Sequence, residues 1–79
     1  MNGTERFLND NFGDADGVLG LLAKHDRPVP NREAARKWFV RGSLTAAWLI
    51  ELMVALQRET GRLADMEAYV DGAENDIFG

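Results

Sequence analysis

Two apolar segments separated by Gly42 constrain the fold of this 79-residue chain most strongly. In residues 31–56, NREAARKWFVRGSLTAAWLIELMVAL, apolar side chains recur every three to four positions on both sides of that glycine. This spacing places them on one face of an α-helix, and glycine accepts the left-handed conformation in which helices often end. The stretch therefore predicts two consecutive helices, one over 31–41 and a longer one from a cap at Thr45 to about residue 60.

The residues before this stretch predict two further short helices. Thr4 is expected to cap the first, with Phe7 and Leu8 on its apolar side, and Gly13 is expected to end it. Asp14 is a suitable cap for the second helix, which should end near residues 25–26.

The segment Arg27-Pro28-Val29-Pro30 predicts an extended connector, because each proline disfavours the helical conformation in the residue before it. Val29 is its one aliphatic side chain and is expected to enter the core. Asn31 then caps the basic helix.

Gly17 and Gly20 interrupt the second helix. Each costs about 1 kcal/mol relative to alanine in a helix interior. They indicate either tolerated flexibility or the close approach of another helix, and the pattern does not choose between the two.

The predicted fold is all-α, a compact bundle of about five short helices that contains a helix-turn-helix. The fifth helix would be formed by a last amphipathic turn or two over 62–70. Residues 1–71 would form this one domain, and residues 72–79 a flexible acidic tail.

Composition excludes several classes of function. The chain has no cysteine, so a disulfide framework and a thiolate metal site are excluded, and the single His25 excludes a site with two histidine ligands. No glycine-rich phosphate loop or nucleophile motif is present, so neither an enzyme nor a cofactor is expected. No apolar run approaches the ~20 residues of a membrane span, and the N-terminus lacks a signal-peptide pattern, which predicts a cytoplasmic protein without membrane association.

Charge is segregated along the chain. The formal net charge is −4, yet residues 24–41 hold six of the nine Lys and Arg residues against two acids. The last seventeen residues hold five acids and no base. The charge distribution therefore favours a polyanion as partner for one segment of an otherwise acidic protein.

The basic segment has the pattern of a DNA-reading helix. Ala35, Trp38 and Phe39 fall on one helical face, and the charged residues fall largely on the other. An α-helix fits the major groove, where guanidinium groups can bind guanine edges and glutamate can accept from cytosine. The candidates for base edges are Arg32, Glu33, Arg36 and Lys37. The candidates for phosphates are Asn31, Arg41, Ser43 and Thr45, with Arg27 adding charge from the connector.

At these residues the chain resembles a family. Asn31, Ala34-Ala35, Trp38 and Arg41-Gly42-Ser43 are similar in order and spacing to the recognition helix of Cro/C1-type (XRE-like) helix-turn-helix regulators of phages and bacteria. The resemblance extends to Leu52 and implies an all-α fold that binds operator DNA, usually as a dimer. The chain departs from the family at two places. The family's turn before the recognition helix is usually tighter than residues 27–30, and Leu44-Thr45 stands where the family often has a proline.

Other interpretations remain open. Ala46, Ala47, Ile50 and Val54 form a second apolar stripe, which indicates either a homodimer interface or a helix central to the monomer. The acidic remainder, the second stripe and the tail also suit a protein-interaction adaptor or antirepressor without specific DNA binding. The basic stripe alone would suit a solvated surface.

Overall fold

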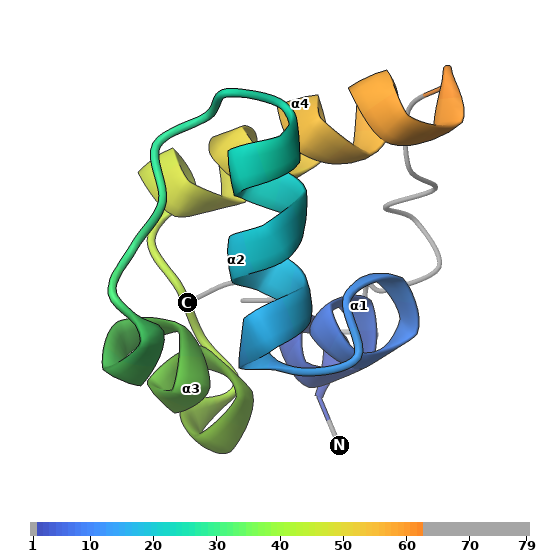
Figure 1. Cartoon of the computed structure of the whole chain (residues 1–79). Helices are drawn as coiled ribbons and strands as arrows, with labels where there is room; N and C mark the ends of the chain where they lie inside the picture. The colour runs from blue at the N-terminus through green and yellow to red at the C-terminus, as the bar shows by residue number, and fades with distance from the viewer. Residues whose placement is uncertain (1, 63–79) are drawn as a thin grey trace.

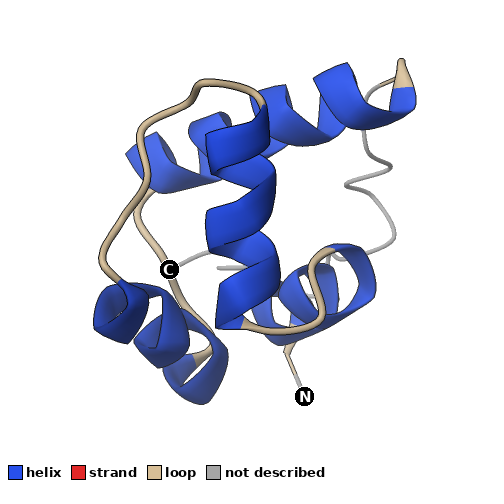
Figure 2. Cartoon of the chain, in the orientation of Figure 1, coloured by secondary structure: helices blue, strands red, loops and turns tan. Residues whose placement is uncertain are grey.

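The computed structural model describes residues 2–62, which form four α-helices and no strand (Figures 1 and 2). They are α1 (Gly3–Asn11), α2 (Ala15–Lys24), α3 (Arg32–Arg41) and α4 (Ala46–Thr60). The prediction of a compact all-helical fold is confirmed for these residues. The expected last turns up to residue 70 and the acidic tail lie outside the described residues.

Helix α2 stands at the centre of the bundle. Its N-terminal end lies near α1 and α3, and α4 crosses its other end (Figure 1). The short segment 42–45 joins α3 to α4, whose axes are bent by 100° relative to each other. No single helix within residues 2–62 is long and apolar enough to cross a membrane; only α3 and α4 taken together meet that test of length and composition, across this bend.

Most helix boundaries follow the signals predicted from the sequence. Side-chain oxygens of the N-caps accept hydrogen bonds from backbone amides three residues on, at 2.9 Å for Asp14, 2.7 Å for Asn31 and 3.4 Å for Thr45. Gly42 and Gly61 end α3 and α4 in the left-handed conformation, with φ of 68° and 81°. These caps satisfy amides and carbonyls that a helix leaves without internal partners.

The first helix begins differently from the prediction. Thr4 is not its cap but lies fully buried in the first turn, and Asn2 is the N-cap. The Asn2 side chain accepts from the amide of Glu5 at 2.8 Å, and the Glu5 carboxylate accepts from the amide of Asn2 at 2.9 Å. The side-chain nitrogen of Asn2 also donates to the carbonyl of Gly42 at 3.0 Å. Asn2 therefore starts α1 and holds it to the end of α3.

The core collects apolar side chains from all four helices and from the segment between α3 and α4. Its buried members are Phe7, Leu8, Val18, Leu22, Ala35, Trp38, Leu44, Leu52, Ala55 and Leu56. The expectation that Val29 enters the core is wrong, because its side chain is 47% exposed and Pro30 is buried instead. Neighbouring side chains of an extended segment point to opposite sides, so an inward Pro30 leaves Val29 outward.

A close approach is found at only one of the two α2 glycines, and it involves the turn before α2 rather than another helix. A Cβ at Gly17 would lie 1.9 Å from the carbonyl oxygen of Phe12, the C-cap of α1, so the turn between α1 and α2 packs directly against Gly17. A Cβ at Gly20 would meet nothing within 4 Å. Gly17 is therefore required by packing, and Gly20 is not.

Candidate nucleic-acid interface

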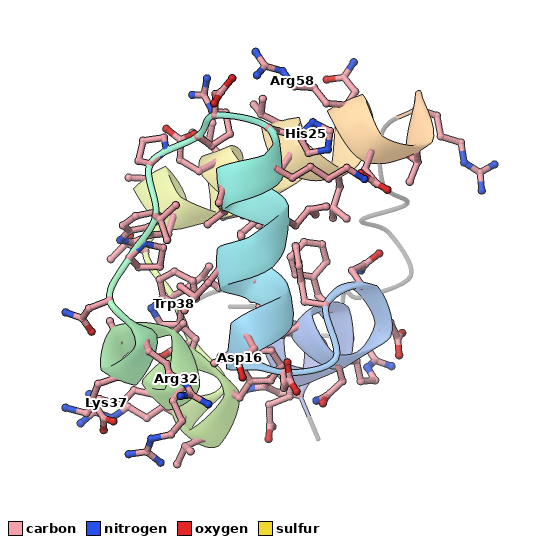
Figure 3. The ribbon with its side chains drawn as sticks, in the orientation of Figure 1. Asp16, His25, Arg32, Lys37, Trp38 and Arg58 are labelled. Atoms are coloured by element: carbon pink, nitrogen blue, oxygen red, sulfur yellow. The ribbon has the colours of Figure 1, made fainter. Side chains whose placement is uncertain are left out.

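Helix α3 has one buried face and one charged, exposed face, as predicted. Ala35 is fully buried and Trp38 is 9% exposed. The exposed charged side chains on the other face are Arg32, Glu33, Arg36 and Lys37, and the 67% exposed Val40 lies among them. Figure 3 shows Lys37 pointing away from the bundle, whereas Arg32 lies beside Asp16 of α2.

Two arginines of this face are bound to carboxylates of the same chain. Arg32 Nη2 donates to Asp16 Oδ2 at 3.0 Å, between side chains that are 72% and 62% exposed. Arg36 Nε donates to Glu33 Oε1 at 3.1 Å, one turn away on the same helix. The hydrogen bond from Arg36 lowers the pKa of Glu33 and keeps this carboxylate charged. Three of the four predicted base contacts, Arg32, Glu33 and Arg36, are thus bound to side chains of opposite charge in the same chain.

The connector side chain Arg27 also has an acidic partner. Its Nε donates to Glu51 Oε1 of α4 at 2.7 Å, and the two side chains are 29% and 23% exposed. This hydrogen bond raises the pKa of the guanidinium, since it stabilises the charged form. Arg27 holds the connector to α4, and its contact with DNA stays a prediction.

A second set of ion pairs joins the far end of α2 to the end of α4. Lys24 Nζ lies 2.9 Å from Glu59 Oε1, and the Nε2 of His25 lies 2.9 Å from the same oxygen. Arg58 donates to the carbonyl of His25 at 2.9 Å. Figure 3 shows His25 and Arg58 at this end, opposite to Asp16. Lys24 is therefore remote from the exposed face of α3, although it belongs to the same basic stretch of sequence.

Lys37 and Arg41 are the predicted basic contacts that form no ion pair within residues 2–62. They line an open hollow of about 630 Å³ in the bend between α3 and α4. Its other lining residues are Ala34, Trp38, Ser43, Leu44, Thr45 and Ala46. Two basic residues, two hydroxyl-bearing residues and the N-terminal end of α4 line this hollow. Such a combination can bind an anionic oxygen.

The nine predicted contacts therefore fall into three groups. Lys37, Arg41, Ser43 and Thr45 share the hollow. Arg32 and Arg36 line a smaller depression of about 200 Å³ together with Asp14, the N-cap of α2, and Asp16 in its first turn. The remaining three are Glu33, paired within α3, Asn31, which caps it, and Arg27 on the connector.

Asp16 and Glu51 are the residues of this region that the sequence did not indicate. Each is a carboxylate that binds a predicted DNA contact, 16 or 24 positions away along the chain. No spacing rule pairs residues at such separations, because the pairs depend on how helices cross. Among residues 2–62, no group of three or more His, Cys, Asp or Glu side chains could hold a metal ion.

Comparisons with known proteins add no assignment. Searches against protein families, curated proteins and solved structures found no match to this chain.

Proposed function

We propose that this chain is a sequence-specific regulator of transcription that binds double-stranded DNA, with α3 in the major groove. The observation that carries the proposal is the exposed face of α3, which presents three basic side chains on a helix fixed by its opposite face. A helix that reads DNA must hold its own backbone rigid while its outer side chains reach base edges. The fully buried Ala35 and the nearly buried Trp38 meet the first requirement.

The two groups of basic residues suit two kinds of DNA contact. Arg32 and Arg36, near the N-terminal end of α3, suit base edges. Lys37 and Arg41, beside the hydroxyls of Ser43 and Thr45, suit the phosphate backbone, since they lack a carboxylate partner within residues 2–62.

A helix-turn-helix formed by α2 and α3 fits the packing of α3 against α2, as in the Cro/C1-type regulators that the sequence resembles. The segment 25–31 between these helices is longer than the turn of 3–4 residues usual in that motif. This connector is held by the buried Pro30, by the ion pair of Arg27 with Glu51, and at its start by the contacts of His25 with Glu59 and Arg58. In this proposal, these anchors replace a tight turn in setting the angle of α3.

The proposed regulator acts as a homodimer, because α4 carries an apolar face that the described bundle does not bury. Ile50 is 59% exposed, Ala46 and Ala47 are exposed, and Val54 is half-buried. Two-fold dimers place two reading helices on successive turns of the major groove. The same face is the specific observation that favours the second candidate, a protein-interaction adaptor or antirepressor without specific DNA binding.

A selection of binding sequences from random duplexes tests the proposal. We expect a short palindromic or repeated motif. Replacing Lys37 or Arg41 by alanine should weaken binding to every duplex and reduce the slope of log K against log salt by about 0.9 for each lost phosphate contact. Arg36→Ala should instead cost ~1–3 kcal/mol and relax one position of the motif.

Arg62→Ala is the matched control, because it removes an exposed positive charge after the end of α4, away from α3. Recovery of no motif, together with equal binding by the Arg36→Ala, Lys37→Ala and Arg62→Ala variants, would refute the proposal. An adaptor would instead bind a protein partner through α4, and Ile50→Asp would abolish that binding without any DNA present.

A further inference from the structure

The carboxylates beside the reading face of α3 are an unexpected feature for a surface that approaches a polyanion. Asp14 and Asp16 lie in the cap and first turn of α2 and line the depression that also contains Arg32 and Arg36. Glu33 lies on α3 itself and binds Arg36. A phosphate that approaches either arginine therefore meets at least one negative charge at short range.

We propose that Asp16 is a specificity-determining residue, a proposal that rests on the DNA-binding function above. Asp16 directs Arg32 to base edges and disfavours the binding of Arg32 to phosphates. Asp16 lowers the affinity for DNA in general more than it lowers the affinity for the correct sequence.

The donor inventory of arginine explains how one carboxylate can discriminate between two ligands. A guanidinium has five N–H donors, and the contact with Asp16 uses the Nη2 of Arg32 alone. The remaining donors stay available for the uncharged acceptors O6 and N7 of guanine. A base edge can thus join the pair, whereas a phosphate bound at the same place would lie next to the Asp16 charge, well within the screening length of roughly 8–10 Å.

Exposure makes this arrangement adjustable rather than rigid. The Arg32 and Asp16 side chains are 72% and 62% exposed, so water and salt screen their attraction. Asp16 therefore competes only weakly with DNA for Arg32. A phosphate can displace Asp16 from Arg32, but its affinity is reduced by the lost ion pair. Lys37 and Arg41 form no ion pair within residues 2–62, although Lys37 interacts electrostatically with Glu33. In this proposal, both supply the contacts that do not depend on sequence.

The test measures affinity for the selected duplex and for an unrelated duplex of equal length. Asp16→Asn removes the charge while Asp14 keeps capping α2. We expect binding to the unrelated duplex to strengthen roughly two- to fivefold, the range of one exposed ion pair. Its salt slope should steepen by about 0.9, because Arg32 then neutralises one more phosphate. The ratio of specific to unrelated binding should fall, and Asp16→Glu should restore it.

Asp26→Asn is the matched control for this variant. It makes the same change of net charge, and Asp26 forms no ion pair within residues 2–62. Its φ of 58° lies in the left-handed region, which asparagine also tolerates. Circular dichroism of each variant confirms that the fold is kept.

The outcomes separate the two proposals. If the wild-type chain selects a motif but Asp16→Asn leaves the ratio unchanged, the inference about Asp16 is wrong and DNA binding stands. Equal strengthening by Asp16→Asn and Asp26→Asn on both duplexes would also overturn it, since net charge alone would then account for the effect. If the wild-type chain selects no motif, DNA recognition and the role of Asp16 fall together.

Discussion

Asn2 provides the sharpest test of how the fold holds α3 in place. Its side chain accepts from the Glu5 amide at 2.8 Å and donates to the Gly42 carbonyl at 3.0 Å. Loss of an N-cap costs ~1 kcal/mol. Loss of one hydrogen bond costs a further ~0.5–1.5 kcal/mol. We therefore expect Asn2→Ala to lower the free energy of unfolding by about 2 kcal/mol.

A companion variant separates the two contributions. Asn2→Ser keeps an oxygen that can cap α1 but lacks the nitrogen that reaches Gly42. It should lose only the second contribution, about 1 kcal/mol. For a domain of this size, each kcal/mol shifts the melting temperature by roughly 4–8 °C.

Thermal unfolding followed by circular dichroism at the helix band measures both shifts, and urea titration gives the free energies. The melting temperature should be highest for the wild type, lower for Asn2→Ser and lowest for Asn2→Ala. If Asn2→Ala has the same melting temperature as the wild type, the contact between α1 and α3 contributes nothing to stability. If the serine and alanine variants melt together, Asn2 does not act as a cap.

Four further substitutions test other features of the structure. Gly20→Ala should stabilise the protein by up to ~1 kcal/mol in a melting experiment, because its Cβ meets open space, whereas Gly17→Ala should destabilise it through the Phe12 carbonyl. Glu59→Gln should lower the free energy of unfolding at pH 7 but not in acid, because hydrogen bonds from His25 and Lys24 lower the pKa of Glu59 below the ordinary 4.5. The stabilisation by Glu59 is complete above that value and is lost as pH falls through the lowered pKa. An equal loss of stability at every pH would contradict this. Ile50→Asp should convert a dimer to a monomer in sedimentation, and a wild-type mass of one chain at tens of micromolar would count against the dimer.

Local signals in the sequence predicted the helices well. Asp14, Asn31 and Thr45 act as caps because a short side-chain oxygen followed by a helical apolar pattern satisfies free amides within the same segment. The start of α1 was mispredicted for a related reason. Asn2 and Thr4 are both good caps, and only the burial of Thr4 in the bundle decides between them.

The candidate site was predictable in its composition but not in its electrostatics. The period of α3 placed Ala35 and Trp38 inward and the charged residues outward. It could not indicate that Asp16 lies beside Arg32, because that contact depends on how α2 crosses α3. Nor could it separate Arg27, held by Glu51, from Lys37 and Arg41, which face an open hollow. Net charge along the sequence therefore overstates the positive charge that α3 presents.

The two tryptophans of the chain meet at the junction between α3 and α4. The rings of Trp38 and Trp48 lie 5.4 Å apart, tilted by 51°. Indole rings at this separation couple electronically, so their near-ultraviolet dichroism depends on the angle between the two helices. Trp38 also lines the hollow with Lys37 and Arg41. The molecule thus carries an intrinsic optical reporter of the bend that holds its basic helix, and the emission of Trp38 should respond to any ligand that enters the hollow.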